Sequence, residues 1–160
     1  MSNRIGLGFD VHAFAPNREL ILGGICIDYK LGLLGHSDAD VLTHALMDAL
    51  LGALALGDIG KHFPDTDEKY KNANSMILLQ NVYQLIKNKG YELVNADMVI
   101  IAQEPKLESY KQQIEKNIAQ YLQANKNQIS VKASTTEKLG FVGKKEGIAA
   151  QAIVLLEQIK

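Results

Sequence analysis

Residues 4–14 alternate between apolar side chains and glycine or polar side chains, which is the period of a β-strand. We expect the odd-numbered positions of this strand to face the core. The even-numbered positions would then form an open face with a glycine floor, and that face presents Asp10 and His12 side by side. The expected core positions are Ile5, Leu7, Phe9, Val11 and Ala13.

Four further stretches have strand character. Residues 19–28 contain two short apolar runs around Gly23 and Gly24, which predicts a tight hairpin. Residues 91–103 predict a strand that stops before Pro105, and residues 129–133 alternate as a short strand. The periodicity of residues 147–159 fits a helix or a strand, and we interpret this apolar segment as a buried strand.

Three segments have helical patterns. Ser37 or Asp38 is expected to cap a helix that continues through good helix formers to about residue 56 and stops at Gly57. Apolar residues at helical spacing predict a second helix that ends at Gly90 and a third over residues 110–122. Residues 57–67 place Gly, Pro and Asp in turn-forming positions and predict a loop.

This mixture of elements predicts an α+β fold, an α/β sandwich in which helices pack on one face of a mixed β-sheet. A chain of 160 residues, 47% hydrophobic and 22% charged, has the composition of a globular protein and the length of a single domain, over residues 1–160. Its net charge of −1 gives no electrostatic attraction to nucleic acid or to an anionic membrane, so we expect neither as a partner.

Cysteine usage and the first residues bear on the compartment. Cys26 is the only cysteine, so neither an intramolecular disulfide nor a cysteine zinc cluster can form. The first residues lack the basic-then-apolar pattern of a signal peptide. The most apolar run, residues 45–56, is short and contains Asp48, which argues against a membrane span. We therefore expect a cytoplasmic protein.

Histidines and aspartates suggest a metal site. Asp40, His44 and Asp48 are spaced i, i+4, i+8 and share one helix face. If that face lies beside the first strand, Asp10, His12 and His44 supply one carboxylate and two imidazoles, the ligand set of a catalytic zinc site with an open fourth position. Asp40 or Asp48 would then orient the His44 ring. The alternative, a group of satisfied polar residues at a surface, fits the spacing equally well.

The segment KASTTEKLGF, residues 132–141, is a second candidate. Hydroxyl residues and Glu137 follow the end of a predicted strand, where proteins of this class commonly carry ligand-binding loops. Hydroxyl and backbone N–H groups suit phosphate, and the Glu137 carboxylate suits a hard cation such as Mg²⁺. An ordinary turn capped by hydroxyl groups is the simpler alternative. The chain has no Walker-type or Rossmann glycine pattern.

Five segments in order resemble one known family over the whole chain: GFDVHAF, the run from GLLGHSDADVLTHAL to ALGDIG, HFPDTD, IIAQEPKL, and KASTTEKLGF with the following EGIAA. The family is that of 2-C-methyl-D-erythritol 2,4-cyclodiphosphate synthases. The resemblance implies cyclisation of 4-diphosphocytidyl-2-C-methyl-D-erythritol 2-phosphate with release of CMP, in non-mevalonate isoprenoid biosynthesis. It also implies a homotrimer whose active sites lie between subunits, and a cytidine diphosphate-type substrate.

The resemblance implies roles for residues at matching positions. Asp10, His12 and His44 would bind one Zn²⁺ per subunit, and Glu137 would hold Mg²⁺ or Mn²⁺ at the substrate diphosphate. We expect His36 and Thr135 to act as catalytic hydrogen-bond donors to the transition-state oxygens. The expected substrate-binding residues are Ser37, Asp58, Ile59, Gly60, Phe63, Pro64, Asp65, Thr66, Asp67, Ala102, Gln103, Glu104, Pro105, Lys106, Leu107, Glu108, Ser134, Thr136, Phe141 and Lys144.

These residues divide by the part of the substrate that they would hold. Residues 58–60 and 63–67 would hold the methylerythritol, residues 102–108 the cytidine, and residues 134–137, with His36 and Ser37, the diphosphate. Two positions depart from the family pattern. Lys144 stands where many members have arginine, which keeps the charge but loses the planar fork. Ala39 replaces a glycine that often follows the HSD motif.

Two other functions are compatible with a zinc site in this chain. A nucleotide diphosphatase would hydrolyse its substrate and incorporate water into the product. A non-enzymatic module would use zinc to stabilise a subunit interface, with a closed coordination sphere and unfolding on chelation. The three-residue ligand set and the long matching loops favour the synthase over both.

Overall fold

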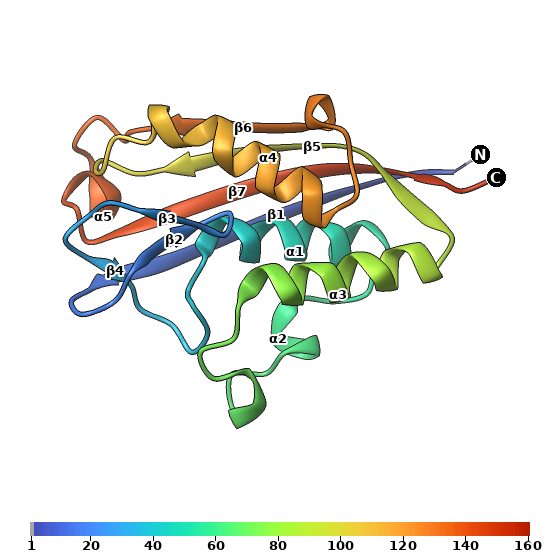
Figure 1. The fold of residues 1–160 in the computed structure, drawn as a ribbon, viewed down its shortest axis with the longest axis horizontal. Helices are drawn as coiled ribbons and strands as arrows, with labels where there is room; N and C mark the ends of the chain where they lie inside the picture. Colours follow the sequence, from blue (N-terminus) through green and yellow to red (C-terminus); the bar gives the residue numbers. More distant parts are fainter. Residues whose placement is uncertain (1) are drawn as a thin grey trace.

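A mixed five-stranded sheet forms the centre of the computed structural model, which describes residues 2–160. The strand order is β4-β1-β7-β5-β6, with β5 and β6 parallel and the other pairs antiparallel (Figure 1). The first and last long strands pair side by side, from Asn3 opposite Glu157 to Ala13 opposite Gly147. The strands are β1 Asn3–Ala15, β4 Gly32–Leu33, β5 Tyr91–Ile101, β6 Ile129–Ser134 and β7 Gly147–Gln158.

Three helices cover one face of this sheet: α1 Val41–Ala53, α3 Ser75–Asn88 and α4 Lys111–Tyr121 (Figure 1). The hairpin of β2 (Leu20–Leu22) and β3 (Ile25–Ile27) forms a separate two-stranded sheet. Single helical turns complete the fold: α2 Ile59–His62, α5 Gly140–Gly143, and the 3₁₀ turns η1 Glu68–Tyr70, η2 Glu108–Tyr110 and η3 Lys126–Gln128. The predicted α+β class, a mixed sheet with helices on one face, is confirmed.

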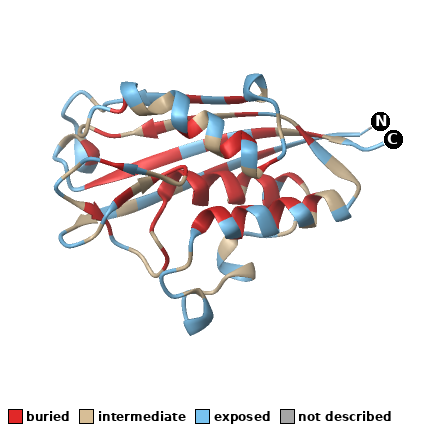
Figure 2. Ribbon diagram, in the orientation of Figure 1, coloured by how far each residue is buried: buried red, intermediate tan, exposed pale blue. Residues whose placement is uncertain are grey.

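The core lies between the sheet and the helices. Helix α1 is buried along almost its whole length, because it is enclosed by the sheet on one side and by α3 on the other (Figure 2). The strands bury one face each, with Ile148, Ala152 and Leu156 of β7 and Met98 and Ile100 of β5 pointing toward the helices. Among residues 2–160, no helix is both long and apolar enough to cross a membrane.

The predicted alternation of β1 is present, but the faces were assigned wrongly. The odd positions are exposed, with Ile5 at 69%, Leu7 at 61% and Phe9 at 56%. The glycine face is the one that packs on α1, because a Cβ on Gly6 or Gly8 would collide with carbonyl oxygens of that helix. Glycine therefore allows the backbones of strand and helix to approach closely, and the apolar face is left open.

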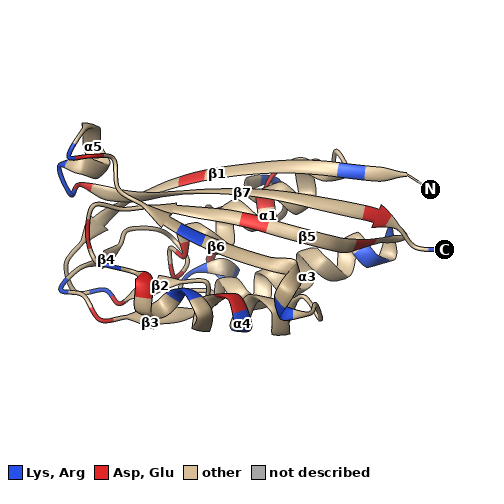
Figure 3. Ribbon diagram, turned by 90° about the horizontal axis from the view of Figure 1, so that it is seen from above, with Lys and Arg blue, Asp and Glu red and all other residues tan. Residues whose placement is uncertain are grey.

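The apolar face of β1 continues onto β7, where Ile153 is 46% exposed opposite Leu7. The charged residues of the two strands are Arg4, Asp10 and Glu157, and the rest of both strands is uncharged (Figure 3). We call the surface formed by Ile5, Leu7, Phe9 and Ile153 the open sheet face. Contiguous exposed apolar surface of this kind usually marks an interaction site.

Helix α1 begins later and ends earlier than predicted. Its cap is Asp40, whose carboxylate accepts the Thr43 amide hydrogen, rather than Ser37 or Asp38. The helix ends at Ala53, because Ala55 already has a left-handed backbone conformation (φ 56°), and Gly57 lies beyond its end. Asp38 instead makes contacts with α3 that are described below.

The remaining elements follow the prediction closely. The Gly23-Gly24 hairpin, α3, α4, β5, β6 and the terminal strand β7 are confirmed within a few residues of their expected limits. The predicted loop 57–67 is not wholly irregular, because α2 forms inside it behind the Asp58 cap. The two-residue strand β4 was not predicted, and its length gives no periodic signal.

Candidate metal centre

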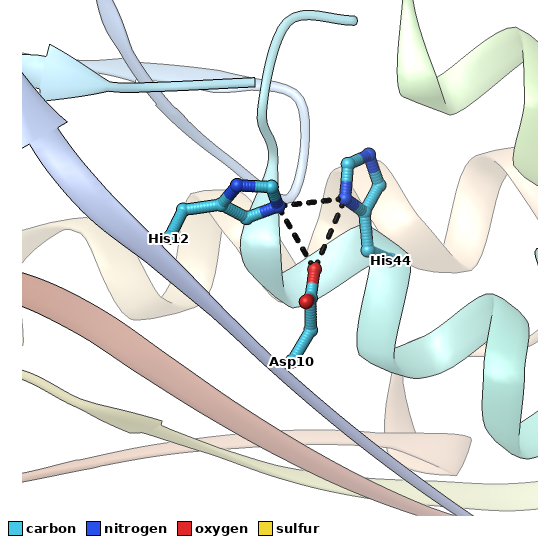
Figure 4. Close-up of side chains that lie close together, drawn as sticks. All are labelled: Asp10, His12 and His44. Carbon is cyan, nitrogen blue, oxygen red and sulfur yellow. Dashed lines mark hydrogen bonds and ion pairs between the residues drawn. The ribbon is translucent and has the colours of Figure 1, made fainter. Parts of the chain in front are cut away.

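Asp10, His12 and His44 point toward one another from two elements (Figure 4). Asp10 and His12 lie two residues apart on β1 and therefore share its helix-facing side. His44 lies in the first turn of α1, and the absence of side chains at Gly6 and Gly8 allows this helix to lie close to β1. The predicted grouping of these three side chains is confirmed in space.

The donor atoms form a nearly equilateral triangle. Asp10 Oδ2 lies 3.0 Å from His12 Nε2 and 3.1 Å from His44 Nδ1, and the two nitrogens are 3.1 Å apart. Ligands bound tetrahedrally to Zn²⁺ at 2.0–2.1 Å lie about 3.3 Å from one another. The triangle is close to that size, so these residues fit one zinc ion and leave its fourth position to a further ligand.

The atoms that do not face the triangle are held by the protein. His12 Nδ1–H donates to the Leu34 carbonyl oxygen at 2.7 Å, which leaves the Nε2 lone pair for a metal. Asp10 Oδ1 accepts the Val11 amide hydrogen at 2.9 Å. Metal-binding side chains typically have such outer partners, because these partners fix the orientation of the ligand.

Electrostatics keep the cluster ready for a cation. Burial alone would raise the pKa of Asp10, but hydrogen bonds and the charges of His12 and His44 lower that pKa far below its ordinary value. Burial alone would lower the pKa of His12, and the hydrogen bond and charge of Asp10 raise it above 6.5. The carboxylate therefore stays ionised beside two imidazoles.

Asp40 and Asp48 do not orient His44, and that prediction was wrong. Asp40 is fully buried and accepts the amide hydrogens of Gly23, Gly24 and Thr43 at 2.8–3.0 Å, so it joins the hairpin to α1. Asp48 accepts the Ile59 amide hydrogen at 2.8 Å and fixes the start of α2. The shared helix face was predicted correctly, but both carboxylates are occupied by backbone groups.

The cluster lies in a cavity of about 370 Å³. The predicted residues that line it, besides the metal ligands, are His36, Ser37, Ile59, Gly60, Phe63 and Asp65. Sequence reasoning missed four further lining residues, Gly35, Met47, Tyr70 and Leu78. Leu78 and Met47 have the helical spacing of core residues, so their pattern carries no sign of a cavity. Tyr70 packs edge-on against Phe63 at 5.3 Å and extends the apolar wall.

The other predicted residues of the 58–67 segment support this wall from outside the cavity. The Asp58 side chain caps α2 through the Lys61 amide, and the Pro64 carbonyl accepts the Asp67 amide hydrogen. The Asp67 carbonyl oxygen accepts from His36 Nε2 at 3.1 Å, which ties His36 to this segment. Thr66 is exposed.

The residues predicted to bind cytidine and diphosphate form a second group at the carboxyl ends of the parallel strands β5 and β6. The Ala102 amide donates to the Ser134 carbonyl oxygen at 2.9 Å, and the Lys138 amide donates to Gln103 Oε1 at 3.0 Å. Glu104, which precedes Pro105 through a cis peptide bond, pairs with Lys145 at 2.6 Å. The two loops therefore form one hydrogen-bonded unit.

The Thr135 and Thr136 hydroxyl groups make hydrogen bonds within the turn that follows β6. The Thr136 hydroxyl donates to the Leu139 carbonyl oxygen at 2.7 Å, and Thr135 Oγ1 accepts the Glu137 amide hydrogen at 3.2 Å. Glu137 is exposed in a left-handed conformation (φ 54°). The alternative of a capped turn thus describes Thr136, and within the described residues 2–160 the Thr135 hydroxyl serves the same turn as an acceptor.

This second group does not reach the cavity. Within the described residues 2–160, none of the members of 102–108 or 134–144 lines it. Leu107 is 3% exposed and belongs to the core, whereas Lys106, Glu108, Phe141 and Lys144 are exposed. One chain therefore carries two separate halves of the predicted site.

Comparisons with known proteins agree with this geometry. The chain matches the YgbB family over residues 3–157. It is 60% identical over 155 residues to 2-C-methyl-D-erythritol 2,4-cyclodiphosphate synthase from Geobacillus sp. (strain WCH70), covering 97% of this chain and 98% of the relative. Its identity to the protein of that name from Clostridium novyi (strain NT) is 59% over 155 residues, with 97% and 99% covered.

Solved structures show the same fold. The bifunctional IspDF from Campylobacter jejuni matches with a TM-score of 0.96 and 51% identity over 99% of this chain. This chain spans only 43% of that longer protein. IspF from Plasmodium falciparum, solved as a CDP complex, matches with a TM-score of 0.88 and 39% identity, covering 99% of this chain and 98% of that one.

Proposed function

Because the chain belongs to the YgbB family, whose relatives are enzymes named 2-C-methyl-D-erythritol 2,4-cyclodiphosphate synthase, we propose that it catalyses the reaction of that name. It would convert 4-diphosphocytidyl-2-C-methyl-D-erythritol 2-phosphate into the cyclic diphosphate and CMP, as a phosphorus–oxygen lyase of isoprenoid precursor biosynthesis. The observation that carries the proposal is the Asp10, His12 and His44 triangle inside a cavity that has an apolar wall.

The donor set supports Zn²⁺ at this triangle, since two imidazoles and one carboxylate with an open fourth position are typical of catalytic zinc. Glu137 would hold Mg²⁺ or Mn²⁺ together with the substrate diphosphate. When bound, these ions would withdraw charge from the phosphoryl oxygens and thereby stabilise the transition state.

The reaction needs no general base. An oxygen of the substrate 2-phosphate, already ionised at neutral pH, forms a bond to the β-phosphorus. The bond from that phosphorus to the bridging oxygen breaks, and the oxygen leaves with the electron pair as part of CMP. The protein has to bring the two ends of a flexible substrate together, and such orientation is worth roughly 7–11 kcal/mol in ideal cases.

The cavity suits the methylerythritol part of the substrate. Ile59 and Phe63 provide apolar wall, while Asp65 and the Gly60 backbone provide polar groups beside it. Ser37 and His36 line the cavity next to the metal ligands, where the phosphates would lie. We propose His36 and Thr135 as the donors that tighten on the transition-state oxygens.

The cytidine half of the site would come from a second copy of the chain. The 102–108 and 134–144 loops lie outside the cavity, so one chain does not complete the site. The open sheet face supports assembly, because its exposed apolar side chains would be buried between copies. We propose a homotrimer with each active site between two subunits. A cytidine diphosphate-type substrate is supported by the Plasmodium falciparum relative, which was solved as a complex with CDP.

We further propose that residues 1–160 act as a single domain in the cytoplasm. The exposed Cys26 thiol supports a reducing compartment, since an exposed free cysteine is prone to oxidation elsewhere.

Phosphorus NMR tests this function directly. The purified protein is incubated with the cytidine diphosphate substrate, Zn²⁺ and Mg²⁺, and the products are followed by ³¹P resonances. CMP and the cyclic diphosphate in equal amounts are the expected result. CMP together with an open-chain product that has incorporated water would identify a hydrolase instead, and bound zinc without turnover would identify a structural metal site.

A further inference from the structure

The side of His44 that points away from the triangle faces two buried hydroxyl groups. His44 Nε2 lies 3.0 Å from Ser75 Oγ and 3.1 Å from Ser37 Oγ. Ser75, the first residue of α3, is fully buried, and Ser37 is 9% exposed. In a site without water, a hydrogen bond is strong and an unpaired polar atom costs free energy. Each hydrogen carried by Nε2 or by the two hydroxyl groups therefore needs an acceptor.

Asp38 decides the direction in which the Ser75 hydroxyl points. The Ser75 hydroxyl lies 2.5 Å from Asp38 Oδ1, and the Ser75 amide donates to Asp38 Oδ2 at 2.9 Å. An ionised carboxylate accepts hydrogen bonds but donates none. The hydroxyl hydrogen of Ser75 therefore points to Asp38, and a lone pair of Ser75 Oγ is left to face His44.

We propose that Asp38, acting through Ser75, is a positioning residue that keeps hydrogen on His44 Nε2 and so leaves the Nδ1 lone pair for the metal. This inference rests on the proposed metal site, because it assigns a purpose to the outer side of one of its ligands. Asp10 alone would favour the opposite tautomer, since its Oδ2 lies 3.1 Å from Nδ1 and attracts a hydrogen there. The Asp38–Ser75 pair opposes that tendency from the other side of the ring.

The same arrangement gives the Ser37 hydroxyl to the cavity. Ser37 Oγ accepts the Ala39 amide hydrogen at 3.3 Å and lies beside the same His44 Nε2–H. A protonated Nε2 has no lone pair to accept from Ser37. The Ser37 hydroxyl hydrogen is thus free for a ligand in the cavity that Ser37 lines.

Two variants test this positioning role of Asp38 and Ser75 in the purified protein. Ser75→Ala removes the nearer of the two hydroxyl oxygens that can accept Nε2–H, and leaves Ser37 Oγ at 3.1 Å. Asp38→Asn removes the charge that fixes the Ser75 hydroxyl, and its single amide oxygen cannot accept both the Asp40 amide hydrogen, 3.2 Å from Oδ1, and the Ser75 amide hydrogen, 2.9 Å from Oδ2. The Ser75 hydroxyl is then no longer held toward residue 38, so both variants should weaken the preference for Nε2–H.

Long-range ¹H–¹⁵N spectra of the metal-free protein report which His44 nitrogen carries hydrogen, and competition with a chelator reports zinc affinity. We expect mainly Nε2–H in the unmodified chain, a shift toward Nδ1–H in both variants, and zinc affinity lowered about 10–100-fold. Asp97→Asn is the control, because it removes one carboxylate charge from β5 whose partner is Lys132 and not a residue of the triangle. It should leave both measurements as in the unmodified chain.

Unchanged tautomer populations and zinc affinity in both Ser75→Ala and Asp38→Asn would overturn the inference. Predominant Nδ1–H in the unmodified chain would also overturn it. Neither measurement uses the substrate. If the unmodified chain carries hydrogen on Nε2 and the variants bind zinc more weakly, but no cyclic diphosphate is made, the proposed reaction is contradicted and the positioning role of Asp38 stands.

Discussion

At the scale of single residues, His44 is the member of the Asp10, His12 and His44 triangle that α1 supplies, and we propose it as a zinc ligand. Replacing it with alanine leaves two donors, so His44→Ala should lose more zinc affinity than the 10–100-fold expected for an outer partner, and turnover should fall with it. Zinc content after dialysis and the rate of CMP release measure the two effects, and circular dichroism checks that the fold persists.

His62→Ala is the control for His44→Ala. His62 lies outside the triangle, and its Nε2 bonds to the Leu56 carbonyl oxygen at 2.9 Å. The His62→Ala protein should therefore retain zinc. A His44→Ala protein that still binds zinc tightly and remains active would contradict the ligand assignment.

The Glu104–Lys145 pair gives a prediction about pH. The hydrogen bond with Lys145 lowers the pKa of Glu104, and the same bond raises the pKa of Lys145. The contribution of Glu104 to stability is therefore present above its ordinary pKa of 4.5 and is lost as the pH falls through its lowered value in the folded protein. The contribution of Lys145 is lost at the other end, as the pH rises above 10.5.

Carboxyl ¹³C titration of Glu104 measures this directly. Lys145→Ala should return the pKa of Glu104 most of the way to 4.5, whereas Lys144→Ala, a change at the adjacent lysine, should leave it lowered. Equal effects of the two changes would show that general positive charge, and not the 2.6 Å contact, lowers the pKa.

At the scale of elements, the approach of α1 to β1 determines whether the metal ligands meet. Gly8→Ala would place a Cβ against the Ala45 carbonyl oxygen, so the helix must move and the free energy of unfolding should fall by roughly 3 kcal/mol or more. Urea denaturation measures the loss, and zinc affinity should fall in parallel because His44 moves with the helix.

Gly52→Ala is the matched change on the other element of this pair, helix α1. A Cβ there would meet only the Leu7 carbonyl oxygen at 4.0 Å, and alanine is the better helix former, so the free energy of unfolding should rise by about 0.5–1 kcal/mol. Destabilisation of similar size at Gly8 and Gly52 would argue against close backbone approach as the cause.

The same pair of elements explains what sequence could and could not predict. Alternation along β1 predicted the strand and placed Asp10 beside His12, because the period of a strand is local. It did not predict which face is buried, because apolar side chains are found in subunit interfaces as well as in the core. The glycines were interpreted as an open surface, whereas they allow the backbone of α1 to come close. Ser75 lies 31 residues after His44 and was predicted only as part of an ordinary helix, so its contact with the metal ligand had no local signal.

At the scale of the whole molecule, the open sheet face is predicted to hold the trimer together. Leu7→Glu places a charge in the middle of that face and should shift the protein to monomers in sedimentation. Activity should fall at least about tenfold, since the loops proposed to bind cytidine would no longer face a neighbour's cavity.

Ile77→Glu is the corresponding control. Ile77 is 47% exposed on α3, on the helical side of the sheet, so a charge there should leave both the oligomeric state and the activity unchanged. A Leu7→Glu protein that stays trimeric and active would show that the open sheet face is not the interface.

The position of β7 has a consequence for biosynthesis. This strand lies between β1 and β5, yet it follows the other four strands in the sequence, and without it the sheet consists of two unconnected pairs, β4-β1 and β5-β6. Contacts so distant in sequence close slowly. Helices α1, α3 and α4 can form during translation, but Gly6 and Gly8 of β1 stay without a neighbouring strand until β7 has been synthesised, so metal capture and assembly should follow the synthesis of residues 147–158.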